Sequence, residues 1–106
     1  MEYYDLPRRY SDGQVAVALF QLAYELDHRA SQAAQYGVVK RGERMMLIAR
    51  ALHRCAEAML DIEPAAPARL LEDADEALSE YVRLYPSDDL DARRYREAIH
   101  AVMARR

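Results

Sequence analysis

The apolar residues between Met45 and Ile62 constrain the fold of this chain more than any other feature. They recur at intervals of three, four, three, four and three residues, with charged side chains such as Arg50 and Glu57 between them. This spacing puts every member on one face of an α-helix, and that face must be buried against another part of the protein. The members of this stripe are Met45, Ile48, Leu52, Cys55, Met59 and Ile62.

Three further segments repeat the amphipathic pattern, and no segment alternates polar and apolar residues as a strand would. We therefore predict an all-α fold, a single-domain antiparallel four-helix bundle. A helical solenoid of the tetratricopeptide type is the competing architecture, but no repeat of suitable length recurs and the first two helices are too long for it. The expected helices cover residues 11–36, 41–62, 66–84 and 87–106.

Local signals predict where the first two helices begin and end. Ser11 and Gln14 fit a capping box, in which each side chain accepts a hydrogen bond from a free backbone N–H at the helix start. Gly37 is expected to end the first helix, because glycine readily adopts the backbone conformation that follows a helix C-terminus. After a short loop, the second helix is expected to begin near Arg41 or Glu43.

The length of 106 residues suits one domain with one core. Residues 1–10 show no helical or strand period, so we expect an extended N-terminal arm that precedes a bundle domain at residues 11–106.

No apolar run is long enough for a transmembrane helix, and the first residues lack the regions of a signal peptide. Cytoplasmic localisation and no membrane partner are expected. Fourteen of the 15 basic residues are arginine, which suggests a GC-rich bacterial source.

No set of residues in the sequence resembles a catalytic site. Cys55 is the only cysteine and lies on the apolar stripe, where it is expected to act as a small buried hydrophobe. His53 is expected to pair with Glu57 one helical turn later. The three glycines are isolated rather than gathered in a phosphate-binding loop. We therefore expect no enzymatic activity.

Two Glu-x-x-His pairs leave a metalloprotein open as the alternative function. Glu25 with His28, and Glu97 with His100, have the spacing that carboxylate-bridged metal sites use in helical bundles. However, Glu25 and His28 share a helix face with glutamines, opposite the leucine stripe, and should point toward water. We therefore expect no metal or other cofactor.

Acidic residues are concentrated in the third expected helix. Residues 61–91 carry ten of the 18 acidic side chains and only two arginines. Two interpretations remain open: the carboxylates face arginines of neighbouring helices or water, or they form a docking surface for a basic partner. Direct binding of nucleic acid is not expected, because the basic cluster at the C-terminal end is short and the net charge is −3.

The sequence thus favours a small non-enzymatic bacterial protein-protein interaction module, such as an adaptor, a secretion-type chaperone, or an inhibitor or immunity protein. Met46, Tyr24 and Tyr36 are expected to be exposed anchors. A homodimer is also expected, because the apolar stripes are wide for four short helices to bury. The partner-binding residues predicted from the sequence are Glu72, Asp73, Glu76 and Glu80 of the third helix and Tyr3, Tyr4 and Tyr10 of the arm.

Overall fold

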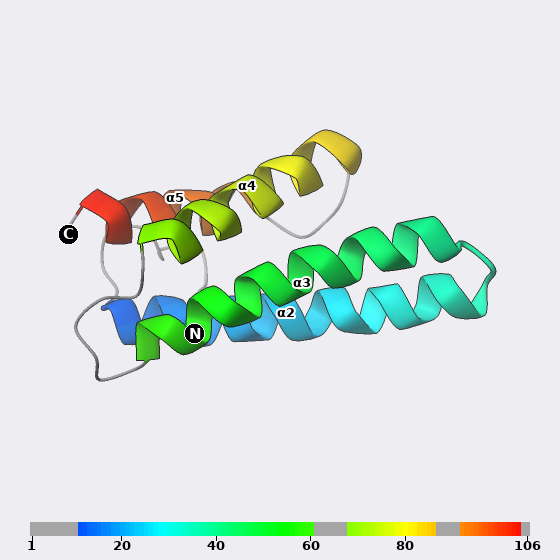
Figure 1. Cartoon of the computed structure of the whole chain (residues 1–106), viewed down its shortest axis with the longest axis horizontal. Helices are drawn as coiled ribbons and strands as arrows, with labels where there is room; N and C mark the ends of the chain where they lie inside the picture. Colours follow the sequence, from blue (N-terminus) through cyan, green and yellow to red (C-terminus); the bar gives the residue numbers. More distant parts are fainter. Residues whose placement is uncertain (1–10, 61–67, 87–91, 105–106) are drawn as a thin grey trace.

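The structure of the chain, a computed structural model, confirms the all-α four-helix bundle. It describes residues 11–60, 68–86 and 92–104. Each helix in this part of the chain packs against the next, and the last returns to contact the first, so that one helical hairpin lies on the other (Figure 1). The helices are α2 (Asp12–Gln35), α3 (Val39–Leu60), α4 (Ala68–Leu84) and α5 (Ala92–Ala104).

Both ends of α2 form as the sequence predicts. Ser11 is the N-cap: the backbone N–H of Gln14 donates to its hydroxyl at 3.3 Å, and the backbone N–H of Ser11 donates to Oε1 of Gln14 at 2.9 Å. At the other end Gly37 adopts a φ of +79°, and the N–H of Val38 donates to the carbonyl of Ala33 at 2.8 Å. This hydrogen bond and the left-handed conformation of Gly37 belong to a Schellman motif, which satisfies carbonyls that the helix end leaves free.

The start of α3 differs from the prediction. The helix was expected from Arg41 or Glu43 but begins at Val39. The Schellman motif already reverses the chain by Val38, and the carbonyl of Val38 accepts the N–H of Gly42 at 3.1 Å. The next helix can therefore start at once, which makes the α2–α3 turn shorter than the loop inferred from the sequence.

Helices α2 and α3 approach each other closely because small residues line their contact. Gly42 is buried, and a Cβ atom placed on it would lie 2.9 Å from the backbone oxygen of Ala30 in α2. Ala23 of α2 and Ala49 and Ala56 of α3 are also buried. Short side chains allow backbones to approach, so this part of the bundle has no room for a larger residue at position 42.

The core of the bundle contains only apolar side chains among the described residues. Every described member of the stripe that begins at Met45 is buried, and Sγ of Cys55 lies 3.9 Å from Sδ of Met59. Helices α4 and α5 add their own buried faces, which include Leu71, Leu78 and Ile99. The sequence therefore predicted the core correctly. None of the described helices is both long and apolar enough to span a membrane.

The two hairpins differ in length. Helices α2 and α3 have 24 and 22 residues, whereas α4 and α5 have 17 and 13. The α2–α3 turn therefore extends past the end of α4, on the right of Figure 1. We call residues 36–47 the hairpin tip. Most side chains of this segment are exposed, whereas Gly42 and Met45 are buried.

Candidate functional site

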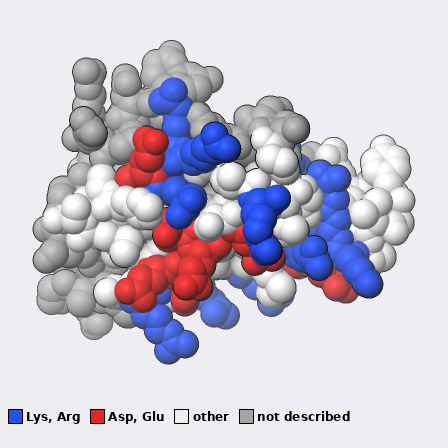
Figure 2. Space-filling view, turned by 90° about the horizontal axis from the view of Figure 1, so that it is seen from above, with Lys and Arg blue, Asp and Glu red and all other residues white. Residues whose placement is uncertain are grey.

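Four carboxylates predicted to bind a partner lie on the outer face of α4. All four are exposed, whereas Leu71, Ala74 and Leu78 on the opposite face of the helix are buried. Within the described part of the chain none of the four takes part in an ion pair. In Figure 2 red atoms gather over α4, with blue atoms beside them and toward the end that carries the α2–α3 turn. We call this set the acidic ridge: Glu72, Asp73, Glu76 and Glu80.

Asp75, on the side of α4 that faces α5, behaves differently from the ridge. Its Oδ1 accepts a hydrogen bond from Nε of Arg96 at 2.9 Å and lies 2.8 Å from Nε2 of His100. Burial alone would raise the pKa of Asp75, but the hydrogen bonds and positive charges of Arg96 and His100 outweigh it and hold the pKa below its ordinary value. One acidic residue of α4 thus links α4 to α5, and this contact does not use the ridge.

The substitution Asp75→Asn is expected to reduce stability in a pH-dependent way. A carboxyl with a lowered folded pKa contributes stability that is present above its unfolded pKa, near 3.8, and is lost as the pH falls through the folded value. Wild type should therefore unfold at a higher temperature than D75N at neutral pH, and the difference should shrink below pH 3.8. Thermal unfolding followed by circular dichroism across pH tests this. An equal difference at every pH would contradict the ion-pair explanation, and Asp73→Asn on the exposed face is the control.

The hairpin tip exposes several large apolar side chains. Tyr36 is 83% exposed and Leu47 is 63% exposed, against 77% for Tyr24 in the middle of α2. Met46, Tyr24 and Tyr36 are exposed, as the sequence predicted, but the sequence did not indicate Leu47. Its exposure could have been inferred from the sequence, because Leu47 lies off the apolar stripe that contains Met45 and Ile48. The exposed large apolar residues of the tip are Tyr36, Val38, Val39, Met46 and Leu47.

The acidic ridge and the hairpin tip adjoin. The guanidinium of Arg41, in the first turn of α3, stacks over the ring of Tyr85 at 4.6 Å from its centroid. Tyr85 directly follows the last residue of α4, and Glu80 lies just over one turn before it. A cation held over an aromatic ring is an attractive contact. It fixes the end of α4 beside the start of α3, so the carboxylates of the ridge lead on to the basic and apolar tip.

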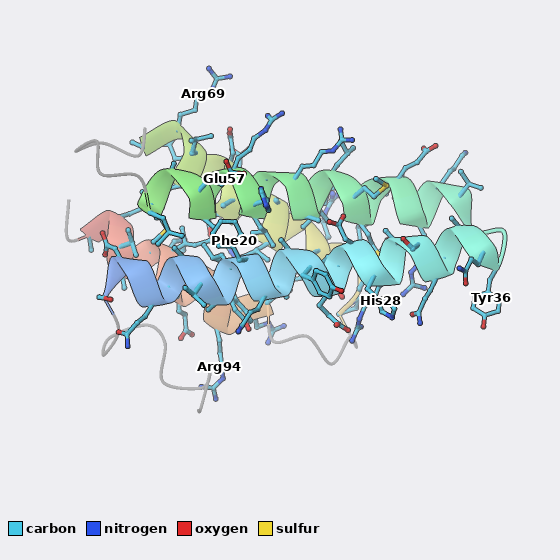
Figure 3. All side chains as sticks on the ribbon, turned by 90° about the horizontal axis from the view of Figure 1, so that it is seen from below. Phe20, His28, Tyr36, Glu57, Arg69 and Arg94 are labelled. Carbon is cyan, nitrogen blue, oxygen red and sulfur yellow. The ribbon has the colours of Figure 1, made fainter. Side chains whose placement is uncertain are left out.

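A groove of about 530 Å³ lies on the hairpin next to the tip. Its lining mixes apolar side chains with charged ones, and Nε of Arg29 is held by Oε1 of Glu25 at 3.1 Å. Its lining includes His28 of α2 and Tyr36, which directly follows that helix; both are labelled in Figure 3. The groove shows that the tip is hollowed as well as apolar.

The residues considered for a metal site pair with other side chains or do not gather into a cluster among the described residues. Glu25 pairs with Arg29, and His100 contacts Asp75. In the ranges that the structure covers, no group of three or more histidine, cysteine, aspartate or glutamate side chains is placed to hold a metal ion. Neither Glu-x-x-His pair therefore belongs to a cluster that this structure supports as a metal centre.

Two further predictions concern α3. Nδ1 of His53 lies 2.6 Å from Oε1 of Glu57, which confirms the surface pair expected from the sequence. The other side of His53 meets Phe20 of α2 in an edge-to-face contact, with ring centroids 4.9 Å apart; Figure 3 shows Phe20 between the two helices. Cys55, the single cysteine of the chain, is fully buried, so it is not accessible as a nucleophile in this structure. These residues serve the packing of α2 on α3.

The remaining predicted residues fall into two groups. Arg96, part of the basic cluster considered for nucleic acid, is engaged with Asp75, while Arg93 is exposed. Others lie outside the described residues: Tyr3, Tyr4 and Tyr10 of the predicted arm, and Arg105 and Arg106 at the C-terminal end. The structure therefore brings the ridge together with the tip.

Comparisons with known proteins identify no relative on which a function could be based. No protein-family model matches the chain, and neither a curated protein nor a solved structure shows significant similarity to it.

Proposed function

We propose that this chain is a small protein-protein interaction module without enzymatic activity, which docks a partner on the joined surface of the acidic ridge and the hairpin tip. The single observation that carries the proposal is the stacking of Arg41 on Tyr85, because it makes these two features one surface. An adaptor, a secretion-type chaperone, and an inhibitor or immunity protein would each need such a surface. A cytoplasmic bacterial protein of this kind fits the expectations from the sequence.

The chemistry of this surface suits a protein partner. Glu72, Glu76 and Glu80 follow one another at four-residue intervals, an arrangement of like charges that slightly destabilises a helix. Within the described residues these carboxylates form no ion pair that would stabilise the bundle. Their presence therefore supports a role outside the bundle. Complementary charge speeds association and disfavours wrong partners, while large exposed side chains such as Tyr36 supply buried contact area.

Reversal of the ridge is expected to abolish partner binding. The variant Glu72→Lys, Glu76→Lys, Glu80→Lys should lose a basic partner that tagged wild type captures from the native lysate, with the association rate reduced at least about tenfold. Quantitative mass spectrometry of the captured proteins, followed by binding kinetics with the purified partner, measures this.

The matched control reverses three exposed carboxylates on other helices. The variant Asp27→Lys, Glu57→Lys, Glu97→Lys changes the net charge by the same amount without touching the ridge or the hairpin tip. It should retain the partner. Equal retention by both variants would show that the ridge is not the docking surface, and equal loss would show an effect of net charge alone.

A further inference from the structure

The groove beside the hairpin tip has more positive than negative charge in its lining. Of the carboxylate and guanidinium groups that line it, those of Glu25 and Arg29 pair with each other at 3.1 Å, so their charges largely cancel. Arg41 lines the groove from α3 and forms no ion pair with any residue that the structure describes. The groove therefore holds one positive charge that no acidic side chain of the lining offsets.

An aromatic ring holds the guanidinium of Arg41 in position. This group lies over the ring of Tyr85, 4.6 Å from the ring centroid. A guanidinium above an aromatic face can still donate hydrogen bonds from its edge, where two parallel N–H groups match the two oxygens of a carboxylate. Because the contact with Tyr85 already restricts the side chain, Arg41 loses less conformational entropy when it binds an anion.

The remaining lining residues are apolar or uncharged. Met45 is 2% exposed and Ala33 is half-buried, so these two side chains form the floor of the groove, and Val38 extends its apolar surface toward the turn. Gln32 and Tyr36 are exposed and add an amide and a phenol, which can donate hydrogen bonds to a ligand. The groove thus combines one cationic group with an apolar floor.

The size and charge of the groove select the kind of ligand. Its volume of about 530 Å³ lies within the range of small-molecule sites, about 300–1,000 Å³. The lining on α2 runs from Glu25 past His28 to Tyr36 (Figure 3), about 16 Å of helix. One unopposed positive charge matches a monoanion, whereas a polyanion would also meet the carboxylate of Glu25. The apolar floor requires an organic body, which inorganic phosphate lacks.

We propose that this groove binds an organic monocarboxylate, whose carboxylate accepts hydrogen bonds from Arg41 and whose apolar body covers Met45 and Ala33. This inference goes beyond the proposed docking function, because the site uses the groove and not the acidic ridge. A free carboxylic acid and the C-terminal end of a peptide both offer this chemistry, and the experiment below distinguishes these two sources.

An NMR titration of the isotope-labelled full chain tests the proposal with two probe acids. One is phenylacetate, and the other is the peptide N-acetyl-phenylalanyl-leucine with a free C-terminal carboxylate. Each is compared with its carboxamide, which has the same shape without the charge. The acids should shift the backbone amide signals of Ala33, Arg41 and Met45 saturably, and the carboxamides should bind at least about tenfold more weakly, because they lack the charge-assisted hydrogen bond. The acid with the lower dissociation constant identifies the source of the ligand.

The variant Arg41→Gln removes the guanidinium and should weaken binding of the acid at least about tenfold, while the carboxamide binds as it does to wild type. A distorted groove would instead weaken both compounds equally, so this comparison separates loss of charge from loss of structure. The matched control is Arg44→Gln, which replaces an exposed arginine on the same helix outside the groove and should bind the acid as wild type does.

Four results would overturn the carboxylate site. They are equal affinity of wild type for acid and carboxamide, equal weakening of the acid by Arg41→Gln and Arg44→Gln, equal weakening of acid and carboxamide by Arg41→Gln, and no saturable shift at the groove up to the solubility limit of either acid. None of them bears on the docking function, which reversal of the ridge tests separately.

Discussion

Leu52→Ala should lower the free energy of unfolding by about 2–5 kcal/mol, the range for removing a fully buried leucine side chain and leaving a cavity. Leu52 lies in the middle of the α3 stripe and is 0% exposed. Helix α3 packs against both α2 and α4, and their close-packed side chains cannot all move to fill the space. Equilibrium denaturation in urea, with circular dichroism as the signal, measures the loss. For a domain of this size the melting temperature should fall by at least about 8 °C.

The matched control for this substitution is Leu47→Ala, the same chemical change on the same helix at an exposed position. Its effect on monomer stability should stay within about 0.5 kcal/mol, as for surface positions in general. A loss at Leu47 as large as that at Leu52 would contradict the packing of α3 described above.

Gly42→Leu is expected to cost about 3 kcal/mol, because overpacking forces backbones apart. The Cβ atom alone would lie 2.9 Å from the backbone oxygen of Ala30, which no side-chain rotation can move away. Helices α2 and α3 would have to separate around this point. Gly42→Ala should cost less, about 1 kcal/mol, because the better helix propensity of alanine offsets part of the strain.

Gly13→Ala is the control for the close approach at position 42. Gly13 also lies in the first turn of a helix, but the nearest atom to its Cβ would be Oγ of Ser11 at 3.9 Å, an ordinary contact. This substitution should leave stability unchanged or raise it by up to about 1 kcal/mol. Denaturation curves of the three glycine variants give the comparison. Stabilisation by Gly42→Ala would show that α2 and α3 have room to adjust.

Sequence periodicity was enough to predict the helices and their buried faces. The stripe through Ile48 and Leu52 is buried because burial of an amphipathic helix depends mainly on which positions share a face. The capping box at Ser11 and the turn at Gly37 were also predictable, since both depend on neighbouring residues. The start of α3 was not, because the Schellman bonds that place Val38 at the helix start depend on the geometry of the turn.

The candidate site was only half predictable. The sequence showed that Glu72, Glu76 and Glu80 share a face, but periodicity could not show which carboxylate of α4 turns to another helix. Asp75 does so because Arg96 and His100 lie opposite it on α5, a pairing set by how the helices pack. Exposure of the tip likewise depends on the end of α4 falling short of the α2–α3 turn, and helix lengths alone do not give that register.

Carboxylate footprinting tests the central claim, that the ridge is a docking surface, most directly. Carbodiimide coupling to an amine, read by mass spectrometry, labels each exposed carboxylate in the free chain and in the isolated complex. The account predicts that Glu72, Asp73, Glu76 and Glu80 are labelled less in the complex, while Asp27, Glu57 and Glu97, which are exposed outside the ridge and the tip, react equally in both. Unchanged labelling of all four ridge carboxylates in the complex would contradict it.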